Sequence, residues 1–446
     1  MLSWLKTRNL HFELFNLAKM SKTREFLSFL LFLISGIQPL LVNAQFKVDA
    51  QYRPRFELRN GYQNLAPRGA TPAAFISQRS RITFSYESEN FKLKFTPQDV
   101  RVWGDEANYT IGANYGDNAS IDLFEAYAEI NLGGMGWVSV GRQQLVYDNE
   151  WLLGARNWNQ NGNSNDAVVF KFKPLGWNLH LGTSWNARTE ASFDNLYPTD
   201  RYKSLNYLWL NKAIIENWNL SVVHIASGIT QTDSTNNINF RQTTGFYSDF
   251  KKNNLNLWGN AYFQYGKNQP GKSVSAYLFA FDASIKTGNF TPGLGISYHS
   301  GNSKLGADLE KDNLFDLIFT ARYKYFGFID YFRTISSHTN QGGLADYYLY
   351  LDYKFTKSVS IRNIGHYFQL AQTNPNTPTN KNLGYENDLV LKYKFSDWGA
   401  IESGYMFFLP TGSLETIQGV PDSKFSNFYY LQLTLTPNLF KQSSAE

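Results

Sequence analysis

Pairs of basic residues separated by a single residue recur in the first third of the chain. The pairs are Arg53 and Arg55, Arg79 and Arg81, and Lys92 and Lys94, with Arg101 following in residues 98–104. Successive side chains of a β-strand point to opposite faces, so residues two apart share a face. Each pair therefore projects two positive charges from one side of a strand. Such charges lining a pore attract anions.

Carboxylates with the same spacing offer a second interpretation. Glu57, Asp99, Glu125 and Glu129 are expected on the same faces as the basic residues, where they can form ion pairs that hold a wall together. Both interpretations stay open, because an arginine in an ion pair still shapes the local potential. The residues expected to line a lumen are Arg53, Arg55, Arg79, Arg81, Lys94, Arg101, Glu125 and Glu129.

Enzyme chemistry finds little support in the sequence. There are no cysteines, so no disulfide or thiolate nucleophile is expected, and the six histidines do not have metal-ligand spacing. The sequence has no G-x-S-x-G motif and no phosphate-binding glycine loop. We therefore expect no cofactor, no metal and no nucleic-acid partner. Inward aromatic residues, among them Tyr127, Trp258, Tyr348 and Tyr350, could form a track for sugar faces or fill space against arginine stems.

The elements that position these residues have a period of two. Apolar residues alternate with polar ones in residues 46–59, 123–132, 255–265, 275–286, 315–325, 347–355 and 429–435. The pattern predicts strands with one apolar and one polar face. In residues 123–132 it places Phe124 on the apolar face and Glu125 on the polar face. In a soluble sandwich the polar face is solvated, whereas in a barrel that spans lipid it must face the lumen.

The connections and the composition decide between these two folds. Short and long connections alternate, which is typical of outer-membrane barrels with short periplasmic turns and long extracellular loops. Aromatic residues make up 17 % of the chain, as the aromatic girdles of such barrels require. The sequence therefore predicts an all-β, antiparallel, up-and-down transmembrane barrel of 18–20 strands. Patterning alone counts about twenty strands, and the hairpin across residues 325–328 is the one whose removal would lower the count to eighteen.

The N-terminal segment resembles a secretory signal. Lys22 and Arg24 precede an apolar run over residues 26–34, and residues 42–44 form a small-x-small cleavage site. We expect residues 1–44 to be removed, with Met20 as an alternative start, and residues 45–446 to form a single barrel domain. The alternative is a signal anchor that stays attached.

Residues 141–166 join two predicted strands through a connection too long for a tight turn. The pattern comprises Gly141, Arg142, Gln143, Leu145, Tyr147, Leu152, Leu153, Gly154, Trp158, Ser164, Asp166 and Ala167, and residues 98–104 read QDVRVWG. Together these resemble the alginate export family of outer-membrane β-barrels, with Trp151 where the family pattern has arginine.

The resemblance implies eighteen strands and a loop folded into the mouth of the pore. The residues expected in that pore loop are Tyr147, Trp151, Gly154, Arg156 and Trp158. The alternative is an external loop packed on its own tryptophans. Strand parity places Arg142 on the face of Val138 and Val140. A bulge at Gly141 would turn Arg142 inward; otherwise it lies beyond the lipid band. We expect Arg142 and Asp166 to line the lumen.

These observations predict a monomeric porin in the outer membrane of a Gram-negative bacterium, surrounded by lipid. It would pass anionic or polyhydroxylated solutes passively, such as the uronate-type oligo- or polysaccharides that the resemblance implies. An outer-membrane hydrolase and an adhesive or structural barrel with a plugged lumen are the alternatives.

Overall fold

The computed structural model describes residues 44–104, 109–110, 113–114 and 121–442. Residues Gln45–Gln442 form one compact unit. The predicted signal segment lies outside the described residues except for Ala44, so its removal stays a prediction. Among the described residues, no helix is long and apolar enough to cross a membrane.

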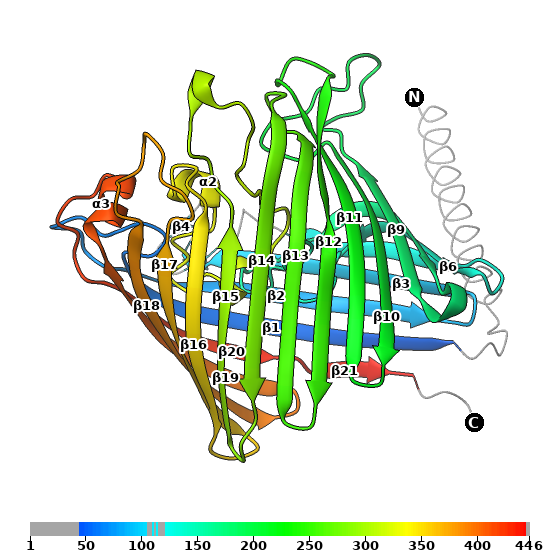
Figure 1. Ribbon diagram of the computed structural model, residues 1–446. Coiled ribbons are helices and arrows are strands. Elements are labelled where there is room, and N and C mark those ends of the chain that lie inside the picture. The colour runs from blue at the N-terminus through cyan, green and yellow to red at the C-terminus, as the bar shows by residue number, and fades with distance from the viewer. Residues whose placement is uncertain (1–43, 105–108, 111–112, 115–120, 443–446) are drawn as a thin grey trace, which may run out of the picture. The chain divides into compact units, whose positions relative to one another are not determined.

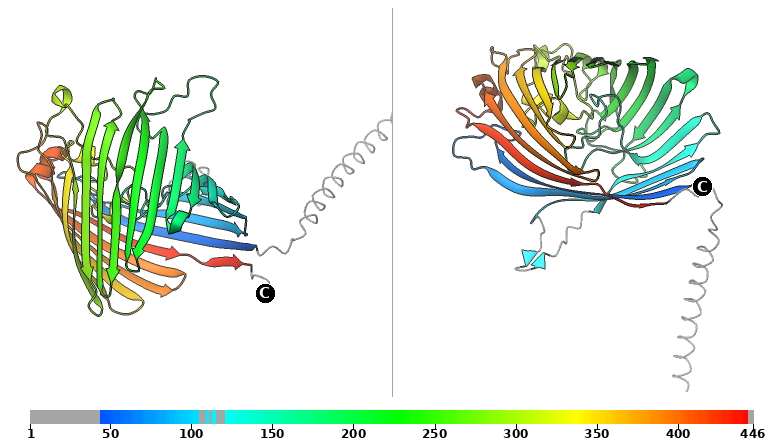
Figure 2. Two further views of the ribbon diagram at one scale, coloured as in Figure 1. Left: turned by 45° about the vertical axis from the view of Figure 1, so that its right-hand side comes forward. Right: turned by 90° about the horizontal axis from the view of Figure 1, so that it is seen from below.

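Eighteen strands of the described chain form a closed antiparallel barrel, which confirms the predicted fold (Figures 1 and 2). Each strand pairs with the next along the chain, and β20 pairs with β1 to close the sheet. The strands are β1 (Gln45–Asn60), β2 (Ala73–Glu87), β3 (Phe91–Val102), β6 (Ile121–Asn131), β7 (Gly136–Gln143), β8 (Asn165–Phe172), β9 (Asn178–Trp185), β10 (Ser204–Ile215), β11 (Trp218–Thr230), β12 (Ile238–Lys252), β13 (Leu255–Lys267), β14 (Ser273–Ile285), β15 (Phe290–His299), β16 (Leu344–Lys354), β17 (Val359–Gln369), β18 (Asn382–Ser396), β19 (Gly399–Pro410) and β20 (Ser426–Leu435).

Strand β14 shows how the period of two builds the wall. Its outward residues include Tyr277, Phe279 and Phe281, which are exposed as a lipid-facing band requires. Its inward residues include Ala276 and Leu278, which are fully buried although they face the lumen. Buried apolar side chains on the inner face show that something other than water fills this part of the lumen.

The predicted alternation was wrong at one point of the wall. In β6, the register shifts opposite Thr96 and Pro97, so Phe124 is the extra residue of a β-bulge. The bulge turns Phe124 inward, 3 % exposed beneath Arg81, and not outward as alternation predicted. After β20, the chain continues as β21 (Asn438–Lys441), which pairs with the first residues of β1.

The predicted strand over residues 315–325 and its hairpin do not exist. Residues 300–343 instead form one long connection between β15 and β16, with α2 (Ile335–His338) and the 3-10 turns η2 (Gly306–Asp308) and η3 (Arg322–Lys324). Removing this hairpin brings the count from twenty to eighteen. The other described short elements are η1 (Pro174–Gly176), α3 (Gly412–Gln418) and the isolated pair β4 (Tyr109–Thr110) and β5 (Ala113–Asn114).

Candidate functional site: the constriction of the lumen

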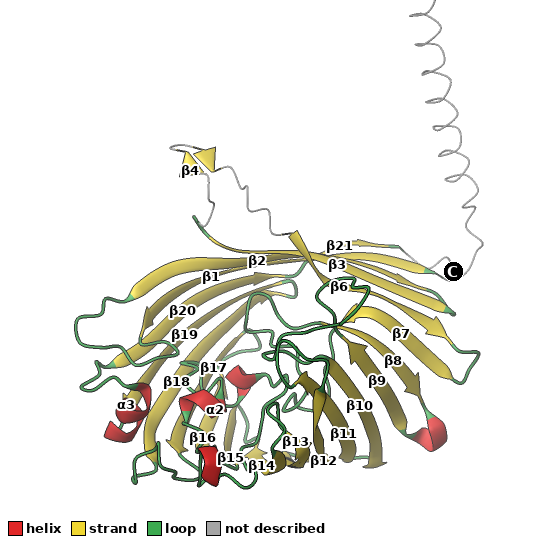
Figure 3. Cartoon of the chain, turned by 90° about the horizontal axis from the view of Figure 1, so that it is seen from above, coloured by secondary structure: helices red, strands yellow, loops and turns green. Residues whose placement is uncertain are grey.

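The connection between β7 and β8, residues 144–164, folds into the barrel, as the view from above shows (Figure 3). We call it the β7–β8 loop. Trp151 and Leu153 are each only 1 % exposed, and Trp158 is buried as well. Tyr147 anchors the start of the loop to the wall through hydrogen bonds with His180 and with Tyr207. The structure therefore places the loop inside the lumen and not outside it.

Arg53 on β1 forms hydrogen bonds to this loop through all three nitrogens of its guanidinium group. Its Nη1 donates to the carbonyl of Asn157 at 2.8 Å. Its Nη2 donates to the carbonyls of Trp158 and Asn159 at 3.3 and 3.2 Å. Its Nε and Nη2 both donate to Gln160 Oε1, at 3.0 and 2.8 Å. The planar fork of arginine, with its five N–H donors, suits such a cluster of acceptors.

Three neighbouring arginines form further hydrogen bonds to the same loop. Arg55 donates to the Trp158 carbonyl at 2.9 Å and lies over the Trp158 ring, 3.9 Å from its centroid. Arg79 donates to the Gln160 carbonyl at 3.2 Å, and Arg81 donates to the Asn161 carbonyl at 3.1 Å. The paired arginines of β1 and β2 thus hold the backbone of residues 157–161, a role that spacing alone did not reveal.

Carboxylates neutralise only some of the basic residues on the inner face of the wall. The ion pairs are Arg55 with Glu57 at 2.8 Å, Arg101 with Asp99 at 2.8 Å, Lys94 with Glu125 at 2.7 Å, and Lys171 with Glu129. Within the described residues, no carboxylate forms an ion pair with Arg53, Arg79 or Arg81. Carbonyl dipoles stabilise a guanidinium but do not cancel its charge, so these three cations retain a positive field in the lumen.

Arg142 and Asp166 do not line the lumen, which corrects the sequence prediction. No register shift occurs at Gly141, so Arg142 keeps the outward face that it shares with Val140. Arg142 Nη2 pairs with Asp166 Oδ2 at 2.9 Å on that outer face. Both residues lie where their strands meet the long loops, the place where a charge on the outer face costs least.

The connection between β15 and β16, residues 300–343, also fills the lumen and binds the first loop. We call it the β15–β16 loop. The amide of Phe319 donates to the Leu152 carbonyl at 2.9 Å, and the amide of Ala321 donates to the Glu150 carbonyl at 3.1 Å. Lys324 forms an ion pair with the carboxylate of Glu150. The two loops therefore form one hydrogen-bonded constriction.

Two carboxylates on β18 hold the far side of the β15–β16 loop. Glu386 accepts a hydrogen bond from the amide of Ile329 at 2.7 Å, and Asp388 accepts one from the amide of Phe328 at 3.2 Å. Gly327 precedes these amides with φ +75°, and a Cβ there would lie 2.3 Å from the Glu386 carboxylate. The wall therefore fixes the loop through its backbone, and the contact requires glycine at position 327.

Between the two loops lies a cavity of about 310 Å³ whose lining includes three arginines, Arg156, Arg322 and Arg333. None of the three guanidinium groups forms a hydrogen bond or ion pair with a described residue, and Arg322 Nε is fully enclosed. Burial, together with the charge of Arg156, lowers the pKa of Arg322 to about 10, so it stays charged at neutral pH. We call this space the arginine cavity. Cations without hydrogen-bond or ion-pair partners have free donors that an anion can occupy.

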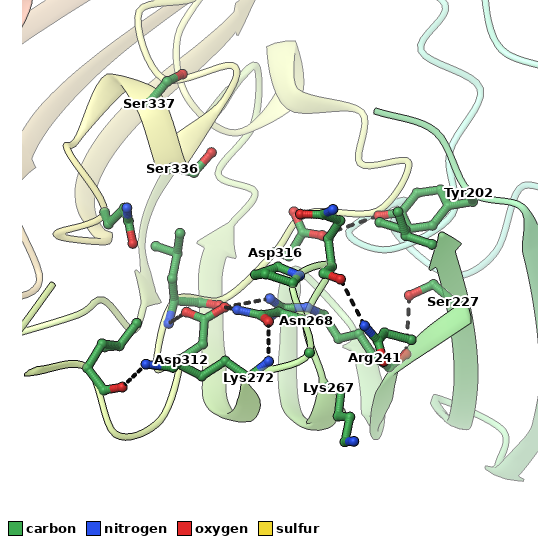
Figure 4. Close-up of a pocket in the computed structure, with 18 of the residues that line it drawn as sticks. Tyr202, Ser227, Arg241, Lys267, Asn268, Lys272, Asp312, Asp316, Ser336 and Ser337 are labelled. Carbon is green, nitrogen blue, oxygen red and sulfur yellow. Dashed lines mark hydrogen bonds and ion pairs between the residues drawn. The ribbon is translucent and has the colours of Figure 1, made fainter. Parts of the chain in front are cut away.

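A larger space of about 910 Å³ lies on the side of the long loops (Figure 4). Its lining mixes apolar residues with polar ones, which include Tyr202, Lys267, Asp316 and Ser336. Arg241 at its edge pairs with Asp312 at 2.8 Å. We call this space the vestibule. It offers hydroxyl, amide and carboxylate groups to a hydroxylated solute.

The sequence identified only part of this site. The predicted pore-loop residues Tyr147, Trp151, Gly154, Arg156 and Trp158 all belong to the in-folded loop. Arg322 was placed on a strand that does not exist, and Arg333 and Asp330 were not singled out. Residues 322–333 contain two arginines, Arg322 and Arg333, but nothing local in the sequence shows that they meet Arg156.

Comparisons with known proteins agree with the fold. The sequence matches the family model described as alginate export over residues 44–410. OpdO of Pseudomonas aeruginosa has a TM-score of 0.59 at 11 % identity, covering 89 % of this chain and 98 % of that one. A BenF-like porin from Pseudomonas fluorescens Pf-5 has a TM-score of 0.57 at 12 % identity, covering 88 % and 99 %.

OpdK of Pseudomonas aeruginosa, solved with vanillate, has a TM-score of 0.54 at 11 % identity, covering 90 % of this chain and 99 % of that one. A search of curated proteins gives no match. At these identities the solved structures support the fold alone.

Proposed function

The chain belongs to the alginate export family, and from this premise we propose that it forms an outer-membrane channel through which anionic, hydroxylated solutes diffuse passively. Uronate-type oligosaccharides are the solutes that fit this description best. The channel works as a single barrel, in lipid, in the outer membrane of a Gram-negative bacterium. The observation that carries the proposal is the arginine cavity between the two in-folded loops.

The arginine cavity supports an anionic solute because its cations lack partners. A carboxylate that enters can accept charge-assisted hydrogen bonds from Arg156, Arg322 or Arg333. Arg53, Arg79 and Arg81 add a positive field from beneath the β7–β8 loop, since loop carbonyls solvate them without neutralising them. A solute anion is therefore attracted to the arginine cavity and to the wall beside it.

The surroundings of the cavity support a hydroxylated solute. Trp158 and Tyr323 also line it, and the partly exposed ring of Tyr323 lies beside the cations, where it suits contact with a sugar ring. The vestibule above supplies further polar groups. Several weak contacts in sequence permit flux, whereas one tight site would stop it. The vanillate in the OpdK structure is a carboxylate bound to a barrel of similar fold, which accords with this proposal.

Planar-bilayer recording of the refolded protein tests the proposal. In a gradient of KCl, the reversal potential should show that chloride passes more readily than potassium, most strongly at low salt, where screening is least. Glucuronate added to one side should reduce the chloride current more than glucose at the same concentration. A conducting channel that prefers potassium, or one that glucuronate and glucose affect equally, contradicts the proposal.

A second candidate, a plugged barrel whose loops bind a partner, is favoured by one observation. The two lumenal loops are well packed, with Trp151, Tyr325 and Phe326 in contact and buried. A folded, heat-modifiable barrel without conductance would support this candidate. The hydrolase alternative has weaker support, because no histidine hydrogen-bonds a serine hydroxyl in the described part of the chain; His366, for example, pairs with Asp346.

A further inference from the structure

One carboxylate lies among the unpartnered arginines. Asp330 lines the arginine cavity beside Arg322 and Arg333 of its own loop and Arg156 of the β7–β8 loop. Within the described residues its carboxylate accepts a single side-chain hydrogen bond, from Gln63 Nε2 at 3.0 Å. The backbone amide of Gln63 donates to the carbonyl of Ile329 at 2.9 Å, which holds Gln63 next to Asp330. Three separate loops thus meet at Asp330.

The backbone of the cavity is strained at the point where these loops meet. Gln63, Arg156 and Asp330 have φ values of +65°, +49° and +65°, in the left-handed region. Residues with a side chain rarely adopt this conformation, because their Cβ then lies too close to the following carbonyl oxygen. Strain of this kind persists where the surroundings impose it, and it gathers at ligand-binding sites. The same three side chains line one cavity, which indicates that the chain is shaped to present them there.

The charges around Asp330 are mostly positive. Arg156 faces it from the β7–β8 loop, and Arg322 and Arg333 face it from its own loop. The other titratable groups near this cluster come from the surrounding wall and loops. They are Arg59 of β1, Tyr62, Tyr202, Asp316, Tyr323, His338, and the wall acids Glu386 and Asp388 behind Ile329. With Asp330 ionised, the carboxylate cancels one of the three guanidinium charges; with Asp330 neutral, all three act on a solute.

We propose that Asp330 is a specificity-determining residue of the channel, whose carboxylate competes with an anionic solute for the three guanidinium groups. This inference rests on the proposed channel function. It has two consequences. The cavity holds anions weakly while Asp330 is ionised, as flux requires. It holds them more tightly once Asp330 takes up a proton, and doubly charged anions gain most.

The titration of Asp330 lies in an accessible range. Burial raises its pKa to about 6, although the Gln63 hydrogen bond and the three arginines oppose that rise. Burial and the neighbouring Arg333 and Arg322 hold the pKa of His338 below its usual value. By linkage, an anion bound in the cavity favours the neutral form of Asp330 and raises its pKa further.

The test compares sulfate binding at pH 8 and pH 5, because sulfate keeps its two charges across this range. Isothermal titration of sulfate into the refolded, detergent-solubilised barrel measures affinity without any conductance. The half-blocking concentration of sulfate for the chloride current measures it again in bilayers. Wild-type protein should bind sulfate about tenfold more tightly at pH 5 than at pH 8, since one unit charge within a few ångströms is worth this much in a partly screened site. D330N should bind tightly at both pH values.

Matched variants identify the titrating group. D422N removes a carboxylate that also has positive φ, 52°, but whose side chain is 75 % exposed; it should behave like wild type. H338Q should keep the pH dependence. The inference is overturned if D330N retains the wild-type pH dependence, if D330N binds sulfate more weakly than wild type at pH 8, or if H338Q abolishes the effect. A barrel that binds sulfate as described but does not conduct would contradict the channel and leave the role of Asp330 in the cavity intact.

Discussion

The indole of Trp151 lies flat on the ring of Tyr325, with the ring centroids 3.9 Å apart and the planes 18° from parallel. The two residues belong to different lumenal loops, and Trp151 stands where the family pattern has arginine. Stacked, desolvated aromatic rings add to the energy of area burial. The contact therefore joins the two loops into one constriction, and a substitution at either ring should loosen both.

Replacing Trp151 with alanine should weaken the constriction. Removing a buried tryptophan costs about 3–5 kcal/mol, so the midpoint of urea unfolding should fall and single-channel conductance should rise. The control is Trp185→Ala, because Trp185 is 58 % exposed. Unchanged conductance in W151A would show that the stacked pair lies away from the permeation path.

Replacing Arg53 and Arg79 together with glutamine should change both selectivity and conductance. The double variant removes two charges that no carboxylate neutralises and several hydrogen bonds to residues 157–160. The reversal potential should move toward potassium, most at low salt, and conductance should rise as the loop loosens. Arg142→Gln is the matched control, because Arg142 faces outward. An unmoved reversal potential would mean that these charges are not felt in the pore.

Deleting residues 149–163 should raise conductance, because the deleted segment fills the lumen between Arg53 and Tyr325. The rise should exceed that of W151A. Bilayer recording of refolded protein measures it, with heat-modifiable migration in gels as the check on folding. Equal conductance in the deletion variant and the wild type would place the segment outside the solute path.

Gly327→Ala should detach the β15–β16 loop from the wall. An added Cβ would lie 2.3 Å from a Glu386 carboxylate oxygen, so either the loop or Glu386 must move. The expected result is a noisier current with a higher mean conductance. Gly306→Ala is the control in the same loop, since Gly306 also has positive φ, +60°, but has open space around it. Both substitutions carry backbone strain, so a difference between them reports the contact with Glu386.

Asp330→Asn should stabilise the barrel at high pH. The folded-state pKa is raised from 3.8 to about 6, so the folded state binds this proton more tightly than the unfolded chain does. The resulting stabilisation is complete below pH 3.8 and is lost as pH rises through about 6. At pH 8 the ionised carboxylate therefore costs about 3 kcal/mol, which asparagine removes. Urea unfolding at pH 4 and pH 8 measures this, and an advantage of D330N that shrinks with rising pH would contradict the sign.

The sequence by itself determined the barrel wall. Alternation with a period of two is a local property of a strand, and lipid excludes charge from one face, so Arg53, Arg55, Arg79 and Arg81 could only be placed inward. The pattern around Gly154 and Trp158 likewise identified the loop that enters the lumen. Patterning failed where the residue types do not distinguish a regular strand from one with a β-bulge. Phe124 faces inward because a bulge shifts the parity, and no residue type in β6 marks that bulge.

Only the tertiary structure decided what fills the lumen. Residues 315–325 alternate like a strand, yet they pack as a loop on the β7–β8 loop. The amides of Phe319 and Ala321 donate to that loop, and residues of both parities, such as Leu317 and Ile318, are buried. The carbonyls that Arg53 grips lie more than 100 residues away along the chain. Arg156, Arg322, Arg333 and Asp330 meet because two separate loops fold into the same lumen. Such contacts depend on where the barrel brings its loops together, and no local pattern encodes that placement.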